Sequence, residues 1–343
     1  MIDFVPSVLA GDRLALARLL TRVENDLPEG RAALDALFPG TGKAHIVGIT
    51  GAPGTGKSSL ANQLALAFRK INVLEEHTQP RVAVVCVDPS SPFTGGAILG
   101  DRVRMRDLSG DPGIFIRSMA SRGALGGLSR ATAAVVQVLD AAGFEWILIE
   151  TVGAGQSEVE IARLAHTTIV VEAPGMGDDI QAIKAGILEI ADILVVNKSD
   201  QPGAENTVRS LRMMIELAHP DHLAAVRNHH GHPVLSEEDT NQGHKLDGVW
   251  VPPVHQTVAT HGDGIDELAK MIIAHREQIK RTGEWQQRAR ARLKSELDQL
   301  VQSELMARWQ TSLPPGSYER VFDQLYSREI SPYTAVQELI GKP

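Results

Sequence analysis

The segment Gly51-Ala-Pro-Gly-Thr-Gly-Lys57-Ser58 decides the fold of this chain. It matches the pattern G-x-x-x-x-G-K-[ST], follows the apolar run 46–50 directly and precedes a helical pattern. Glycines let backbone N–H groups turn toward phosphates, Lys57 reaches the β and γ phosphates, and the Ser58 hydroxyl is suited to Mg²⁺. We therefore expect a nucleotide to contact Gly51, Ala52, Pro53, Gly54, Thr55, Gly56, Lys57, Ser58 and Ser59.

Short apolar runs on both sides of this loop predict an α/β fold, a P-loop NTPase with a mainly parallel central sheet. The runs are 45–50, 81–87, 146–149, 167–171 and 192–196. They lack polar alternation, which is typical of strands buried on both faces. Helical patterns at 58–70, 128–142 and 179–191 separate them.

Helical patterns also flank the predicted sheet. Residues 1–42 form an N-terminal helical extension, for which we expect two helices interrupted at Pro28-Glu29-Gly30. The nucleotide-binding domain is expected over residues 43–265. Residues 266–343 form a long charged helical arm, whose length indicates a surface for a partner.

Composition argues against several other classes of protein. The 343 residues include 34 Lys and Arg against 42 Asp and Glu, for a formal net charge of −8. This charge gives no general attraction to nucleic acid or anionic membranes, so neither is expected as a partner. Cys86 is the single cysteine, and no apolar run is long enough for a membrane span. Residues 1–20 carry Asp3 and Asp12 and lack the basic start and apolar core of a secretory signal. We expect a cytoplasmic protein.

Asn197-Lys-Ser-Asp200 follows the run 193–196, where a guanine-reading N-K-x-D loop belongs. The Asp200 carboxylate could accept hydrogen bonds from guanine N1 and the exocyclic amine, which adenine does not offer, and Lys198 would lie over the ring. An exposed polar loop is the alternative interpretation. Downstream, Ala259 is a candidate for a backbone contact with the guanine oxygen, although a plain strand-to-helix loop explains it equally well.

Acidic residues near the ends of predicted strands are candidates for a Mg²⁺ site. Glu150 opens Glu150-Thr-Val-Gly153, in which Gly153 would sense the γ phosphate and begin a switch segment. Asp88 and Asp101 provide further carboxylates, and Mg²⁺ prefers such oxygen ligands. The alternatives are a helix cap for Glu150 and a turn residue for Asp88.

Three longer segments resemble one family, the MeaB/ArgK-type P-loop GTPases, also described as methylmalonyl-CoA mutase-associated G-protein chaperones. The segments are residues 87–105, residues 150–158 (ETVGAGQSE) and residues 177–192 (GDDIQAIKAGILEIAD). The resemblance implies GTP/GDP and Mg²⁺ as cofactors and an adenosylcobalamin-dependent acyl-CoA mutase as partner. The protein would gate cofactor loading and the release of inactivated cofactor. A homodimer formed through the C-terminal arm is also implied.

The resemblance further assigns roles to individual residues. Lys57, Asp101 and Glu150 would be catalytic, and the metal would be held by Ser58, Asp88, Asp101 and Glu150. Nucleotide state would reach the partner through Gln156, Asp178, Asp179, Gln181 and Lys184. An ordinary solvated helix face is the alternative for the last two. Because Ala154 rather than glutamine follows Gly153, we expect slow intrinsic hydrolysis that rises when a partner orders the switches.

Three other functions stay open from the residues alone. A GTPase that inserts nickel or zinc would share the fold, and His229-His230-Gly-His232 invites that interpretation, but a solvated loop explains these histidines better. An ATP-dependent kinase of a transport system is disfavoured by Asp200. A module that binds nucleotide without hydrolysing it is disfavoured by the presence of Lys57, Ser58, Asp101 and Glu150.

Overall fold

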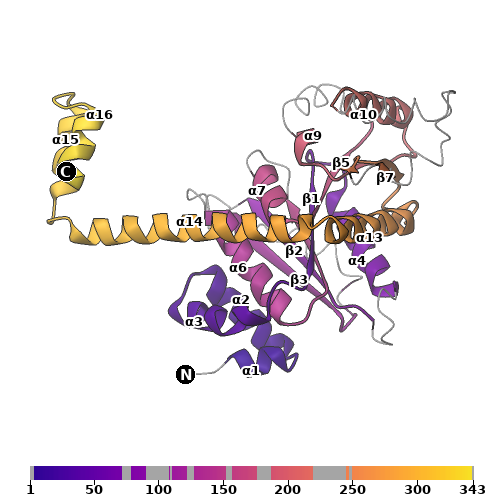
Figure 1. Ribbon diagram of the computed structural model, residues 1–343, viewed down its shortest axis with the longest axis horizontal. Helices are drawn as coiled ribbons and strands as arrows, with labels where there is room; N and C mark the ends of the chain where they lie inside the picture. The colour runs from indigo at the N-terminus through magenta and orange to yellow at the C-terminus, as the bar shows by residue number, and fades with distance from the viewer. Residues whose placement is uncertain are drawn as a thin grey trace. The chain divides into compact units, whose positions relative to one another are not determined.

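A seven-stranded parallel sheet forms the centre of the molecule (Figure 1). The computed structural model describes residues 4–71, 79–89, 108, 110–121, 127–151, 157–175, 187–218, 245–246 and 249–341. The strand order is β3-β2-β4-β1-β5-β6-β9. The strands are β1 (His45–Thr50), β2 (Val82–Pro89), β3 (Ile114–Ser121), β4 (Trp146–Thr151), β5 (Thr167–Glu172), β6 (Ile193–Asn197) and β9 (Val254–Thr257). A separate antiparallel pair joins β7 (Lys245–Leu246) to β8 (Val249–Trp250).

The prediction of a parallel α/β sheet is confirmed. Every residue of β1, β4, β5 and β6 is buried, as expected for strands covered on both faces. The two edge strands of this sheet, β3 and β9, are not among the apolar runs that predicted strands.

Helices cover both faces of the sheet. On one face, α4 (Lys57–Lys70) and α13 (Ile265–Arg281) bury apolar side chains against β1, β2 and β6. On the other face lie α6 (Gly127–Ala141), α7 (Ser157–Leu164) and, beside β5 and β6, α10 (Ala204–Ala218). The short helix α9 (Ile187–Ile190) precedes β6.

The N-terminal extension contains three helices where two were expected: α1 (Phe4–Leu9), α2 (Arg13–Glu24) and α3 (Pro28–Leu37), followed by η1 (Phe38–Gly40). The predicted break at Pro28-Glu29-Gly30 is wrong, because these residues form the first turn of α3. Proline is tolerated there since that N–H needs no helical partner. A Cβ on Gly30 would lie 2.8 Å from the Arg22 carbonyl carbon, so glycine permits close packing of α3 on α2.

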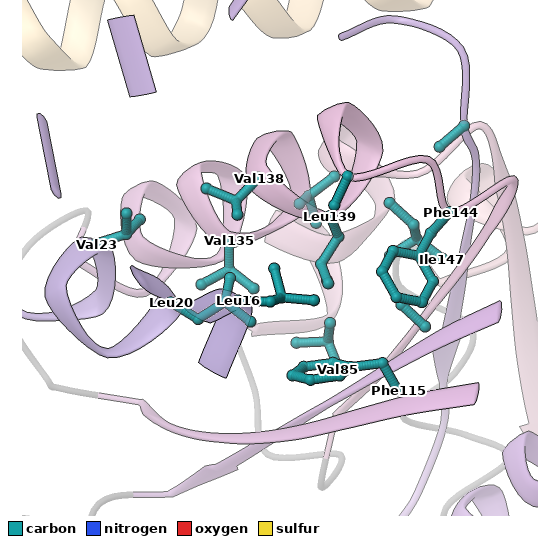
Figure 2. Packing of buried hydrophobic residues seen from close by; sticks show 14 of the residues in the cluster. Leu16, Leu20, Val23, Val85, Phe115, Val135, Val138, Leu139, Phe144 and Ile147 are labelled. Carbon is teal, nitrogen blue, oxygen red and sulfur yellow. The ribbon is translucent and has the colours of Figure 1, made fainter. Parts of the chain in front are cut away.

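The N-terminal helices share a hydrophobic core with the central sheet and α6. Figure 2 shows Leu16, Leu20 and Val23 of α2 packed against α6, with Val85 and Phe115 of the sheet below. About 25 cal/mol is gained for each Å² of apolar surface buried in such contacts. The extension 1–42 is therefore no separate domain in the structure.

The chain divides into two compact units, Met1–Ala289 and Arg290–Pro343. The boundary falls later than residue 266, where the arm was expected to begin. Leu268 and Ile272 of α13 explain the difference, since both are fully buried in the same core cluster as α4. The second unit holds the rest of α14 (Glu284–Ser312), α15 (Ser317–Tyr326) and α16 (Pro332–Ile340).

The first turns of α14 are fixed to the first unit at the end of the sheet where β1 and β5 begin. Trp285 stacks on His166 with ring centroids 3.8 Å apart. Arg288 donates to both carboxylate oxygens of Asp192, at 2.8 and 3.0 Å. Within the ranges given above, no helix combines the length and the apolar composition that crossing a bilayer requires.

Candidate nucleotide-binding site

The phosphate loop leaves β1 at Thr50 and enters α4 at Lys57. At two positions of this loop, neighbouring atoms lie so close that only glycine fits. Gly51 has φ +134°, and a Cβ there would lie 2.1 Å from the carbonyl oxygen of Val171. Gly56 has φ +91°, and a Cβ there would lie 2.4 Å from the side-chain nitrogen of Asn197. Any larger residue would displace the loop from β5 or from Asn197.

The positive groups of this loop are arranged for an anion. The Lys57 side chain is 5% exposed, and its Nζ donates to the carbonyl oxygens of Gly51 and Ala52, both at 2.9 Å. The first N–H groups of α4 have no helical partner, and they carry the positive end of the helix dipole. Pro53, Gly54 and Ser59 are exposed, so the outer rim of the loop is accessible.

Ser58 and Glu150 meet beside the loop. The Ser58 Oγ donates to Glu150 Oε1 at 2.5 Å, and Glu150 lies on β4, paired in register with Ile49 of β1. The Glu150 side chain is 5% exposed. A hydroxyl and a buried carboxylate this close together are the oxygen donors that Mg²⁺ takes, so the donor set fits that ion.

Asp88 lies near the carboxyl end of β2, whose neighbour is β4: Val87 pairs with Thr151. Its backbone is thus at the same edge of the sheet as Glu150. Other predicted site residues lie outside the part of the chain that the structure describes: Asp101, Gly153, Gln156, Asp178, Asp179, Gln181 and Lys184. The same is true of the histidines at 229, 230 and 232.

Asn197 connects three loops at this edge. Its Nδ2 donates to the Thr55 carbonyl oxygen at 2.8 Å, within the phosphate loop. Its Oδ1 accepts from Thr257 Oγ1 at 3.1 Å and from the Ala259 N–H at 3.0 Å. The side chain is buried, so its hydrogen bonds are shielded from water. Asn197 thereby fixes the segment after β6 to the segments after β1 and β9.

Lys198 and Asp200 belong to the loop that follows Asn197. Lys198 has a left-handed backbone, with φ +58°, and its Nζ donates to the Gly54 carbonyl oxygen at 2.7 Å. Its side chain therefore lies along the phosphate loop. Asp200 is exposed. Its carboxylate is accessible to a base held beside Lys198.

The backbone N–H of Ala259, the predicted contact for a guanine oxygen, also has a partner within the protein. It donates to Asn197 Oδ1 at 3.0 Å. An N–H has one proton, so a guanine oxygen at this position would share it with Asn197. The sequence could not predict this contact of Asn197 with the segment after β9, because Asn197 and Ala259 are 62 positions apart.

A parallel sheet with a phosphate loop after β1, a buried carboxylate at the end of β4 and an Asn-Lys-x-Asp loop after β6 defines a P-loop GTPase. Residues 16–313 match the family described as "Methylmalonyl Co-A mutase-associated GTPase MeaB". The chain belongs to this family.

Individual relatives agree with that assignment. A putative GTPase of Pyrococcus abyssi is 42% identical, with 99% of this chain and 98% of the relative covered. The GTPase ArgK of Escherichia coli is 37% identical, over 81% of this chain and 76% of the relative. A Caenorhabditis elegans protein named "Methylmalonic aciduria type A homolog, mitochondrial" is 29% identical, over 97% and 80%. A crystal structure of a LAO/AO transport system kinase superposes with a TM-score of 0.67 at 26% identity, covering 98% of this chain and 95% of that chain.

Proposed function

We propose that this protein hydrolyses GTP with Mg²⁺ and uses the cycle to serve an adenosylcobalamin-dependent acyl-CoA mutase. The observation that carries the GTPase activity is the hydrogen-bond network of Asn197, which joins the phosphate loop to the segments that would read the base. Phosphates and base would therefore be bound on one preassembled surface.

The chemistry requires positioning and charge neutralisation more than covalent catalysis. Bound Mg²⁺ would neutralise charge on the β and γ phosphates; Ser58, Asp88, Asp101 and Glu150 are its proposed ligands, directly or through water. Lys57 would turn from the Gly51 and Ala52 carbonyls to the phosphates. We also propose that Gly153 senses the γ phosphate and that hydrolysis by the protein alone is slow.

The proposed partner rests on the relatives. The family description names methylmalonyl-CoA mutase, and one relative is named for methylmalonic aciduria. We propose that the chain acts as a chaperone that gates cofactor loading and the release of inactivated cofactor, in the cytoplasm. Gln156, Asp178, Asp179, Gln181 and Lys184 would couple nucleotide state to the mutase.

We propose a homodimer formed through the helical arm. α14 extends over 29 residues, none of them buried in the single chain. Leu293, Leu297 and Leu300 are 45%, 59% and 42% exposed and recur at spacings of four and three. Such a row favours packing against a second helix, because it would remove a continuous apolar stripe from water.

The experiment is to measure turnover of GTP and ATP by the purified protein, alone and with a cobalamin-dependent acyl-CoA mutase from the same genome. We expect hydrolysis selective for GTP that accelerates with the mutase. Equal turnover with and without every such mutase would refute the proposed partner, and tight stoichiometric nickel or zinc binding would favour the metal-insertion alternative. Preference for ATP would favour the kinase.

A further inference from the structure

The segment Val258–Gly264 forms a closed turn between β9 and α13. The Val258 N–H donates to the Asp263 carbonyl oxygen at 3.0 Å, and the N–H groups of His261 and Gly262 donate to the Val258 carbonyl oxygen at 2.9 and 3.0 Å. At its start, the turn is attached to Asn197 through the Ala259 N–H. The proposed function places a guanine base beside this turn, and the present inference rests on that proposal.

The far end of the turn is held by a side chain that the motifs do not include. His255 lies on β9 and is 7% exposed. Its Nε2 is 2.8 Å from the carbonyl oxygen of Gly264. A carbonyl oxygen only accepts, so the ring proton is on Nε2 and is donated to Gly264. Burial lowers the pKa of His255 below its usual range, which favours this neutral ring.

Gly264 is where the turn makes its tightest approach to β9. It has φ +74°, and a Cβ there would lie 2.3 Å from the Gln256 carbonyl oxygen and 3.0 Å from His255 Nε2. The next residue begins α13, whose Ile265 and Leu268 are buried in the core. The His255 hydrogen bond therefore links β9 to Gly264, the residue directly before α13.

We propose that His255 is a positioning residue for guanine. Asn197 fixes the first part of the turn and His255 fixes the last, so the N–H of Ala259 is held in place from both ends. Without the His255 hydrogen bond, the last part of the turn loses its side-chain link to β9 and is held by the backbone hydrogen bonds of the turn and by α13. Part of the binding free energy of guanine would then be used to order this part of the turn. The phosphate loop does not contact His255 in the hydrogen bonds described above, so the phosphates are bound as before.

The test compares His255→Leu, His255→Gln and the control Gln256→Ala. Leucine removes the donor but keeps an apolar side chain, whereas glutamine restores a donor of similar reach. Gln256 is the neighbour of His255 on β9, and its side chain bonds Glu205 of α10 at 3.3 Å instead of the turn. Dissociation constants are measured for GDP, IDP and ADP, together with KM and kcat for GTP and the thermal midpoint.

We expect His255→Leu to weaken GDP about tenfold, the effect of one lost hydrogen bond, with KM for GTP rising and kcat kept. IDP should weaken by the same factor, because hypoxanthine keeps the C6 oxygen and lacks only the 2-amino group that Asp200 would read. ADP should not change, and His255→Gln should restore GDP affinity. Gln256→Ala should behave as the parent protein.

An equal loss for GDP and ADP, or no rescue by glutamine, would overturn the proposal. So would a lowered thermal midpoint with GDP affinity intact, which is the signature of a merely structural histidine. The proposed GTPase function is judged separately, by the preference of the parent protein for GDP over ADP. Failure of the His255 proposal leaves that preference in place.

Discussion

The hydroxyl of Ser58, in the first turn of α4, and the carboxylate of Glu150, on β4, lie 2.5 Å apart although 92 residues of sequence separate them. This pair is the part of the proposed Mg²⁺ site that the described residues define. Glu150→Gln keeps the size of the side chain and removes its charge. We expect the Mg²⁺ concentration for half-maximal GTP hydrolysis to rise about 10- to 100-fold.

The control for Glu150→Gln is GDP affinity in excess chelator. Without divalent metal, the variant and the parent protein should bind GDP with similar affinity. A large loss of GDP affinity under those conditions would show that Glu150 supports the loop itself.

Asn197→Ala should lower both stability and nucleotide affinity. The substitution leaves the Thr55 carbonyl and the Ala259 N–H without their partner, and each buried group left unsatisfied costs about 1–3 kcal/mol. Urea unfolding and GDP titration measure the two effects. Thr257→Val removes only one of the three hydrogen bonds, so it should cost about 1 kcal/mol. If both variants cost the same, Asn197 does not act as the connection between loops.

Asp200→Asn should change the base that is bound. A carboxylate accepts from the N1–H and 2-amino groups of guanine, whereas an asparagine amide also donates and suits the 2-oxo group of xanthine. We expect GTP affinity to fall by about 10²-fold or more and XTP affinity to rise. Competition between GTP and XTP for the same site measures this, and unchanged preference would exclude Asp200 as the base reader.

Stability should depend on pH through the buried groups at the start of β1 and β5. Burial, with help from neighbouring His166, Arg276 and His275, holds the pKa of His45 well below its usual 6.5. The unfolded chain therefore takes up this proton first, and stability should fall as pH drops below about 6.5, by about 1.4 kcal/mol per pH unit for one proton. Chemical denaturation between pH 7.5 and 5 measures the slope.

A second loss should follow at lower pH. Burial alone would raise the pKa of Asp192, but the neighbouring His275, whose Nε2 lies 3.3 Å from Oδ1, and the paired Arg288 together lower that pKa from 3.8 to about 2. The stabilisation present above pH 3.8 should thus disappear as pH falls toward 2.

His45→Gln should flatten the slope between pH 6.5 and 5, whereas changing the exposed His261 to Asn should not. Equal slopes in both variants would contradict the assignment to His45.

Leu297→Glu should convert the proposed homodimer to monomers, because a charge would lie in the middle of the apolar row on α14. Light scattering coupled to gel filtration measures the mass. Gln302→Glu adds the same charge on the opposite side of the helix, and it should leave the dimer intact. A parent protein that is monomeric at all concentrations tested would refute the dimer.

The central strands could be predicted because burial on both faces leaves a continuous apolar run. β3 carries Arg117 and Ser118 in the middle of its sequence, and β9 has only four residues, including His255 and Gln256. Both lie at an edge of the sheet, where such residues are tolerated, so their sequences do not stand out. Similarly, α13 and α14 share a helical pattern, and only packing assigns α13 to the first unit.

The candidate site also has parts that the sequence predicts and parts that only the structure shows. The phosphate loop and the Asn-Lys-x-Asp loop are local, since each motif's residues are neighbours in the chain. The roles of Asn197 and His255 depend on which loops meet at the edge of the sheet, and they required the structure. The residues predicted for metal binding and partner coupling that lie outside the described ranges stay predictions.

The place of β1 in the sheet also bears on how the chain folds. β1 precedes the other six strands of the sheet in sequence, yet both of its neighbours, β4 and β5, begin only at Trp146 and Thr167. During synthesis, the phosphate loop is therefore made long before the strands that hold it in place. Until β4 and β5 have been synthesised, β1 is an apolar segment without its partner strands. Parallel pairings between distant segments form slowly, and exposed apolar strands aggregate. Yield of active protein should thus be more sensitive to synthesis rate and temperature than its final stability suggests.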